Sequence, residues 1–539
     1  MRCRVSLPVL GLLSSVLWFT GCAKRETPAE EGIRTHTLLL GNQNEPATLD
    51  PHLMDAATDQ NIALALYEGL TVFDEGTAQP VPAVAERWDV SPDGLVYTFH
   101  LRPAVRWSNG DPVTARDFAY SFQRILTPKL GSTYAYMLWP IKNAKAFNAG
   151  QLADFAQVGV TVLDDATLRV TLDRPTLYLA ALAAHPTWMP VHRATIEKFG
   201  KLEDRDSAWT RPGNLVGNGP FVLTEWRPNA RLVVAKNPHY WGAVQNHLAR
   251  VIFFPTEKSD IEELNFRAGQ MHVTFAVPSS KIPTYRQQAP DRLRIDRQIY
   301  TFYVNFNVTK PPLDHVKLRR ALALAIDREA IVRAVYQGAA QPALTLTAPD
   351  HSGYVAPAPP ACDFAAARAL LADAGFPGGR GLPSFPMQVL NDDKQPRVAE
   401  AIQAMWQREL GVRITIEPLE QKTVFQNQQT LTHVIGITGW VADYADPITF
   451  LDLFRTGGGN NWTGWGSKDY DRLLEAAADT ADPRARFKIL QQAETLLLDE
   501  APIAPYAFVS RAYLIHPAVK NWLPAPLGYH RYQLVELKN

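Results

Sequence analysis

Hydrophobic and polar positions along the chain follow two periods, and together these predict a mixed α/β protein. Short apolar runs at residues 37–41 and 434–438 predict buried strands. Leu318, Leu322 and Ile326 recur at a spacing of four and predict one buried face of a helix. Because strands and helices alternate along the later chain, the pattern favours a parallel sheet in each folded unit.

Turn and capping residues delimit further elements. Asp93-Gly94 predicts the turn of a hairpin over residues 83–102, and Thr114 predicts a helix start with Asp117 in its first turn. The remaining predicted elements are a helix over 61–70 ending near Gly69, a helix after Asp327 ending near Gly338, an Ala-rich helix over 363–374, an apolar stripe over 398–406, a strand over 412–417, and a helix starting at Asp482-Pro483.

The N-terminus has the pattern of a targeting segment. Arg2 and Arg4 precede an apolar run over residues 5–20, which ends in Gly21-Cys22. This end resembles a bacterial lipoprotein cleavage box, so we predict a signal peptide over 1–21 and lipidation at Cys22. The alternative is an uncleaved transmembrane anchor, but the run is short for that and contains Gly and Pro. Residues 22–35 are then the lipid anchor and a solvated tether.

Length and charge limit the classes of function. A chain of 539 residues predicts two to four domains. Lys plus Arg and Asp plus Glu both total 54, so the balance gives no electrostatic case for binding nucleic acid. Cys3 would leave with the signal peptide and Cys22 would carry the lipid, so Cys362 remains alone and the mature domain has no intrachain disulfide.

Motifs of catalysis are absent from the sequence. It contains no nucleophile elbow, no zinc-protease motif, no Walker loop and no Cys-x-x-Cys. The glycines at 457–459 could cradle a phosphate, but no Lys-Ser/Thr follows them, so a flexible loop is the better interpretation. We therefore predict no catalytic residue, no metal, no cofactor and no enzymatic activity.

The segment over residues 439–447 carries the strongest candidate site. Trp440 and Tyr444 flank Asp443, directly after the strand predicted over 434–438. A strand that ends in an aromatic-flanked acid at a turn can present a charge to a cleft. The alternative is a surface loop in which Asp443 and Asp446 only make turn hydrogen bonds.

Several stretches together resemble one family, the peptide-binding proteins of bacterial ABC importers, which are solute-binding proteins of family 5. The resemblance runs from about residue 37 to the C-terminus and is densest over 83–118. The other stretches that carry it are 45–51, 66–70, 217–221, 237–241, 318–328 and 440–447.

The resemblance implies a two-lobed periplasmic-binding-protein fold of the Venus-flytrap type, with an extra domain inserted in the first lobe. Lobe I then comprises residues 36–75, 206–302 and 516–539. The inserted domain covers 76–205, and lobe II covers 303–515.

The resemblance also implies a site. Asp443 stands where family members pair an acid with the α-ammonium of a peptide. The ligand is expected to add as a strand between Asp55-Ala56-Ala57 and Gly439-Trp440-Val441. Tyr134 matches a contact near the ligand's amino end, although it could equally be a core or rim aromatic. The expected ligand-binding residues are Asp55, Ala56, Ala57, Tyr134, Gly439, Trp440, Val441, Ala442, Asp443 and Tyr444.

One part of the family pattern is missing. Some relatives hold the peptide carboxylate with basic side chains, and the corresponding positions here are Gln395, Gln428 and Ile437. The aromatic residue that those relatives place between the two motifs falls near Gln421. Capture of the ligand's amino end therefore looks retained, whereas capture of its carboxyl end is in doubt. Ligands could be longer, masked at the C-terminus, or derived from cell-wall peptides.

The function implied is a lipid-anchored, extracytoplasmic receptor in the periplasm or at the cell surface. It would pass oligopeptides to the permease and ATPase subunits of an ABC importer. Two alternatives stay open. One is a receptor for a non-peptide solute, such as a metal chelate, an opine or a sugar. The other is a secreted enzyme, for which the sequence offers no nucleophile or metal set.

Overall fold

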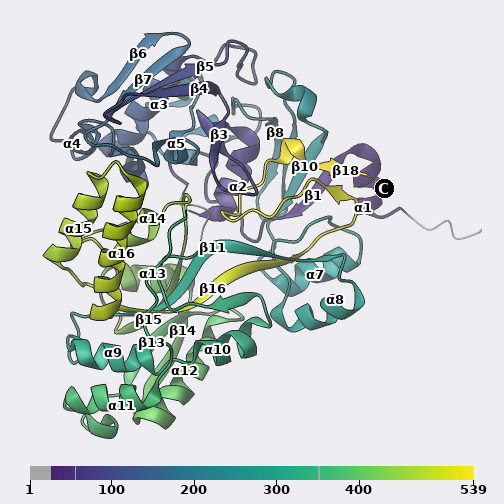
Figure 1. Cartoon of the computed structure of the whole chain (residues 1–539). Helices are drawn as coiled ribbons and strands as arrows, with labels where there is room; N and C mark the ends of the chain where they lie inside the picture. Colours follow the sequence, from purple (N-terminus) through teal and green to yellow (C-terminus); the bar gives the residue numbers. More distant parts are fainter. Residues whose placement is uncertain (1–25, 55, 350–352, 539) are drawn as a thin grey trace, which may run out of the picture.

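The computed structural model describes residues 26–54, 56–349 and 353–538. Three sheets of four or more strands form the framework of the molecule. Strands β4–β7 form one, β1 and β8–β10 form another, and the largest contains six strands. Figure 1 shows β4–β7 at the top, the six-stranded sheet below, and α15 and α16 at the side between them. The signal peptide and Cys22 lie outside the described residues.

Two of the sheets mix parallel and antiparallel pairs. The four-stranded sheet of lobe I has the order β1-β10-β9-β8, in which only β1 and β10 are parallel. The sheet of lobe II has the order β12-β16-β11-β15-β13-β14, in which only β13 forms parallel pairs. The prediction of a parallel sheet in each lobe is therefore wrong. Neighbouring strands such as β8 and β9, and the long strands β11 and β16, pair antiparallel, and antiparallel strands do not need the helical crossover that joins parallel ones.

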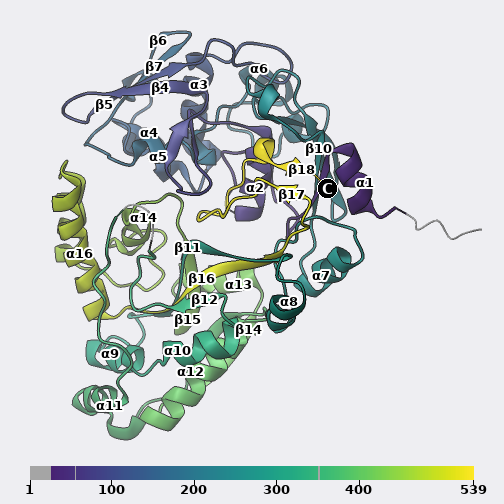
Figure 2. The ribbon, with the colours of Figure 1, turned by 45° about the vertical axis from the view of Figure 1, so that its right-hand side comes forward.

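The antiparallel pair of β11 (Leu293–Phe306) and β16 (Ile503–Leu514) connects the lobes. At one end Leu514 packs with Leu39 of lobe I, and at the other Ala504 belongs to the core of lobe II. Both strands run side by side across the middle of the molecule in Figures 1 and 2. The boundary predicted at 302/303 therefore falls inside a continuous strand rather than in a loop.

Residues 76–205, predicted as the inserted domain, contain the predicted hairpin. Strands β4 (Ala85–Val90) and β5 (Val96–Leu101) pair antiparallel around Gly94, whose φ of +71° suits the turn. Helix α3 (Ala115–Leu126) begins with the predicted cap, in which Thr114 and Asp117 form a capping box. Both local predictions are confirmed.

Helices of lobe II also begin where polar caps predict them. Asp363 caps α11 (Phe364–Asp373), and Asp482 caps α16 (Pro483–Glu500), each by accepting backbone N–H bonds. Asp327 accepts from Ala330 N at the start of α10. The other helices of this lobe are α9 (Val316–Leu324), α10 (Arg328–Ile331), α12 (Gln395–Leu410), α13 (Gln421–Gln429), α14 (Ile448–Leu451) and α15 (Lys468–Ala478).

Two helices differ from the prediction. Helix α2 spans Ala57–Leu66, four residues earlier than predicted, because the N–H groups of Asp59 and Gln60 already bond to Ala56 O. Residues Pro28–Thr35, predicted as solvated tether, form α1, which starts with a capping box between Thr27 and Glu30. Ala29 docks this helix on lobe I, since Ala29 N donates to Gly269 O at 2.9 Å.

The remaining strands are β1 (Thr37–Gly41), β2 (Thr71–Phe73), β3 (Pro80–Pro82), β6 (Val160–Asp164), β7 (Thr167–Thr171), β8 (Phe221–Arg227), β9 (Arg231–Lys236), β10 (Arg250–Phe254), β12 (Ala340–Pro342), β13 (Phe385–Leu390), β14 (Ile414–Leu419), β15 (Ile435–Val441), β17 (Val519–Lys520) and β18 (Glu536–Leu537). The remaining α-helices are α4 (Ala144–Asn148), α5 (Leu179–Leu182), α6 (Arg193–Phe199), α7 (Ser259–Arg267) and α8 (Ile282–Gln288). Within the described ranges, every helix is too short or too polar to cross a bilayer.

Candidate ligand-binding site

Strand β15 has one edge that is only partly paired. The strand confirms the prediction over 434–438 and extends it to Val441. It pairs with β11 along its whole length, from Ile435 to Val441, but with β13 only at Ile435 and Gly436. Beyond Gly436, the second edge of β15 therefore has no strand beside it among the described residues.

The free edge carries the peptide groups expected to bind a ligand strand. Ala442 N donates to Ile299 O at 2.8 Å, which turns that peptide group toward β11. Because successive peptide groups alternate, those of Gly439 and Val441 face the opposite edge. An exposed edge of this kind is a template for an added strand. A side chain at position 439 would lie 2.7 Å from the Phe302 and Tyr300 rings, so glycine permits their packing.

The expected strand on the lobe I side is only partly present. Asp55 lies outside the described residues. Ala56 is extended, with φ −114° and ψ 141°, but Ala57 is already the first residue of α2. The prediction of a strand through Ala57 is therefore wrong, because the N–H groups that follow bond within the helix. Ala56 remains half-buried and able to face a ligand.

Asp443 is a buried carboxylate without an ion pair in the described part of the chain. Only 9% of the residue is exposed, and its own N–H donates to Thr449 Oγ1 at 3.2 Å. Burial raises the pKa of this carboxyl from 3.8 to about 7. Placing an unpaired charge in such a position is costly unless a partner of opposite charge arrives.

Aromatic side chains from separate parts of the molecule converge on Asp443. Burial and the nearby Asp443 charge raise the pKa of Tyr136, from the inserted domain, and of Tyr529, from the C-terminal segment. Sequence reasoning missed both, because their distance from residue 443 along the chain hides the proximity. Tyr134 stacks on Tyr136 at 5.5 Å and on His185 at 5.6 Å between ring centres. It thus belongs to the same aromatic group.

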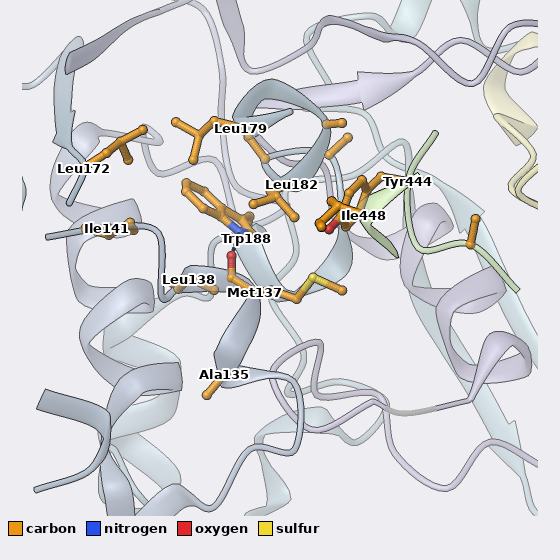
Figure 3. Close-up of a cluster of buried hydrophobic side chains, with 14 of the residues drawn as sticks. Ala135, Met137, Leu138, Ile141, Leu172, Leu179, Leu182, Trp188, Tyr444 and Ile448 are labelled. Carbon is orange, nitrogen blue, oxygen red and sulfur yellow. Dashed lines mark hydrogen bonds between the residues drawn. The ribbon is translucent and has the colours of Figure 1, made fainter. Parts of the chain in front are cut away.

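The other residues of the motif pack in different ways. The indole of Trp440 is half-buried, and its Nε1 lacks a hydrogen-bond partner among the described residues. Ala442 and Tyr444 belong to a hydrophobic core that also contains residues of the inserted domain. Figure 3 shows Tyr444 and Ile448 beside Leu182 of that domain, with Leu179 farther from them. The Nε1 of Trp440 is thus a buried donor without a partner among the described residues, which is uncommon in folded proteins.

Asp446, three residues after Asp443, is satisfied within the protein. Both of its carboxylate oxygens accept from Arg486, at 2.7 and 2.8 Å. Oδ1 also accepts from Ile448 N, as the surface-loop alternative predicts for turn residues. The two acids of the motif thus differ: Asp446 stabilises the turn, whereas Asp443 has no ion pair with any residue that the structure describes.

The three positions that correspond to carboxylate-binding residues in relatives are buried and neutral. Gln395 Oε1 accepts from Leu390 N at 2.8 Å, and Gln428 Oε1 accepts from Asn305 Nδ2 at 3.1 Å. Ile437 belongs to the core of lobe II. Gln421 is exposed at the start of α13. A cation that sequence reasoning missed, half-buried Lys394, precedes Gln395, and burial lowers its pKa.

Other chemistry is not assembled within the described ranges. They contain no group of three or more His, Cys, Asp or Glu side chains placed to hold a metal ion. Cys362 is half-buried and free. The glycines at 457–459 lie between η10 (Asp452–Phe454) and α15; the φ of +71° at Gly457 favours glycine, whereas a side chain at Gly459 would meet no atom within 4 Å.

Comparison with known proteins shows related chains of nearly the same length. The chain is 33% identical over 529 residues to the periplasmic oligopeptide-binding protein OppA of Salmonella typhimurium, covering 96% of this chain and 95% of the relative. It is 35% identical over 486 residues to the probable deoxycholate-binding periplasmic protein YgiS of Escherichia coli, covering 89% of each chain.

Two solved structures of one relative share the architecture of this chain, and they match the arrangement of its lobes to different degrees. The Escherichia coli murein tripeptide binding protein MppA matches with a TM-score of 0.84 at 31% identity, covering 93% of this chain and 98% of that one. The unliganded open form of MppA covers 93% and 97%, also at 31% identity, but matches with a TM-score of only 0.74. The lobes of this chain are therefore arranged less like the open form than like the other MppA structure.

These likenesses confirm the predicted two-lobed α/β fold. Residues 79–462 also match the family described as bacterial extracellular solute-binding proteins, family 5 middle. The chain belongs to family 5 of the bacterial extracellular solute-binding proteins, the family that its motifs predicted.

Proposed function

We propose that this protein captures oligopeptides between its lobes, with Asp443 as the partner of the peptide α-ammonium. The observation that carries the proposal is the buried carboxylate with no ion pair among the described residues. A peptide amine supplies the missing charge and recovers the cost of desolvation. The neighbouring tyrosine rings give the amine an apolar enclosure, in which the attraction between opposite charges is strong.

The free edge of β15 supports the same proposal. A peptide added there bonds through its backbone to Gly439 and Val441, and these bonds are independent of ligand sequence. The half-buried indole of Trp440 lies between these two residues. Broad specificity for side chains, combined with a strict demand for a free amino end, follows from this arrangement.

The wider role rests on the N-terminal sequence and the family. Cys22 would carry a lipid that holds the receptor at the membrane, in the periplasm or at the cell surface. The ligand-loaded form would deliver peptides to the permease of an ABC importer. ATP hydrolysis would belong to the importer's ATPase subunits, since the sequence has no Walker loop.

Titration calorimetry with free and N-acetylated tri- to hexapeptides tests the proposal. We expect Asp443→Asn to weaken binding of free peptides by about 2–5 kcal/mol, because it removes one partner of a buried charge pair. N-acetylation of the peptide should cost a similar amount in the native protein and little more in the variant. Asp469→Asn, at an exposed residue paired with Arg472, is the matched control.

An unchanged affinity of Asp443→Asn for free peptides would show that Asp443 is not the anchor. Native mass spectrometry of protein purified without denaturation gives an independent view. Bound species of a few hundred daltons that fragment as peptides are expected. A single non-peptide species would instead favour the alternative below.

A second candidate function is binding of a non-peptide solute, and one relative favours it. YgiS is named for deoxycholate, an acid without an amine. A carboxylate ligand would be repelled by ionised Asp443, so Asp443→Asn should leave its affinity unchanged or raise it. The same variant therefore separates the two candidates by the sign of its effect.

A further inference from the structure

Tyr178 of the inserted domain stacks on Tyr444 of lobe II. The two ring centres are 5.1 Å apart and the rings are inclined by only 5°. Tyr178 immediately precedes α5, and Tyr444 immediately follows Asp443. The contact therefore joins the inserted domain to the turn that carries the proposed ligand anchor.

Arg486 completes the contact from the side of lobe II. Its guanidinium carbon lies 5.5 Å from the centre of the Tyr178 ring, within range of a cation–π interaction. The same guanidinium donates both bonds to Asp446, and only 5% of its side chain is exposed. Arg486 thus binds the turn of lobe II and the ring of the inserted domain at once.

The surrounding contacts are apolar and also cross between the two parts. Ile448 and Tyr444 of lobe II share one buried cluster with Leu179 and Leu182 of the inserted domain. Figure 3 shows Leu182 next to Ile448 and Tyr444, with Trp188 and Met137 nearby. The chain matches the unliganded open form of MppA less well than the other MppA structure, so this contact belongs to an arrangement of the lobes that differs from that open form.

We propose that Tyr178, Tyr444 and Arg486 form a latch that holds the inserted domain against lobe II when the lobes close over a ligand. The role of the latch rests on the proposed binding of peptides, whereas its existence rests on the contacts described above. Tyr178 is a positioning residue: it acts on the ligand through Tyr444 and the turn, and it also hinders reopening. A bound peptide is then released only after the stack separates.

Substitutions at Tyr178 test the latch without changing any residue of lobe II. Tyr178→Ala removes the stacked ring, whereas Tyr178→Phe keeps it, so the Phe variant is the matched control. Three properties are measured for each protein: the association and dissociation rates of a fluorescent tetrapeptide, the radius of gyration by X-ray scattering with and without that peptide, and the unfolding temperature.

We expect Tyr178→Ala to release the peptide about threefold to tenfold faster, the range that corresponds to one aromatic pair, with little change in association rate. Its radius of gyration with the peptide should exceed that of the native protein. Tyr178→Phe should behave as native in both measurements. If Tyr178 had only a structural role, Tyr178→Ala would lower the unfolding temperature, but it would not raise the dissociation rate of the peptide relative to its association rate.

A native dissociation rate together with a native radius in Tyr178→Ala would overturn the latch. If no peptide binds to the native protein, the proposed function fails by itself. The radii of gyration of the unliganded native protein and of unliganded Tyr178→Ala then test the latch. A contact that favours closure should make the native protein the more compact of the two. Equal radii in that case overturn the latch as well.

Discussion

The two ends of the proposed ligand path differ in charge. At the amino-end region, Asp443 is a buried carboxylate without an ion pair among the described residues. At the carboxyl-end region, Gln395 and Gln428 are buried but neutral, and each uses its side-chain oxygen in a bond within lobe II. A buried charge demands an opposite charge, whereas a buried neutral amide is satisfied by a hydrogen bond. If the proposed function holds, the protein would bind one end of a peptide through charge and the other end without it.

The same contrast exists within one turn, between Asp443 and Asp446. Arg486 neutralises Asp446 through two hydrogen bonds, so this acid stabilises the folded chain. The structure supplies no such partner for Asp443 within the described ranges. Under the proposed function, Asp446 would serve folding and Asp443 would serve binding, and substituting each in turn separates these roles.

The largest expected effect is on stability, at Asp446. Asp446→Asn leaves the buried Arg486 without its counter-charge and should lower the free energy of unfolding by about 3–5 kcal/mol. Urea unfolding followed by circular dichroism measures this loss. Asp443→Asn should cause no comparable loss at pH 7, because it removes a carboxylate that burial already disfavours. Equal losses in the two variants would contradict the division of roles.

The next effect is a pH dependence that belongs to Asp443. Its pKa of about 7 in the folded protein lies above the value of about 3.9 in an unfolded chain. The folded state then binds the proton more tightly, so this stabilising contribution is complete below about pH 4 and is lost as the pH rises to 7.

Peptide binding should show the opposite trend, because the ligand amine pairs with the ionised carboxylate. Below pH 7 the amine stays protonated while Asp443 gains a proton, so affinity should fall about tenfold for each unit of pH. Calorimetry at pH 7, 6 and 5 measures the slope. Asp443→Asn should give a nearly flat profile, and a flat profile in the native protein would contradict the role of Asp443.

Local sequence signals predicted the elements but not their convergence. Caps at Thr114, Asp363 and Asp482 were found because a side chain and the N–H groups it binds lie within three residues. The capping box of Thr27 and Glu30 is of the same kind and could have been found. The direction of the strands in the mixed sheets could not have been predicted, because it depends on which segments, far apart in the sequence, pair with one another.

The residues of the candidate site likewise fall into those that the sequence identified and those that only the fold brings together. Asp443 and Trp440 were identified because the motif is contiguous and resembles a family landmark. Tyr136 and Tyr529 approach Asp443 only through the packing of the inserted domain and the C-terminal segment, which no local pattern records. The neutrality of the carboxyl-end region could be seen in sequence, but the bond between Gln428 and Asn305 that occupies it could not.

The smallest expected effect sharpens the comparison at the carboxyl end. Amidating the C-terminus of a peptide removes its negative charge, and we expect affinity to change by less than about threefold, because exposed or unpaired end charges contribute little. N-acetylation of the same peptide is the matched change at the other end. A loss greater than tenfold on amidation would contradict a neutral carboxyl-end region. It would point instead to half-buried Lys394 as the cation that receives the carboxylate, and Lys394→Met should then abolish the difference between the amidated and free peptides.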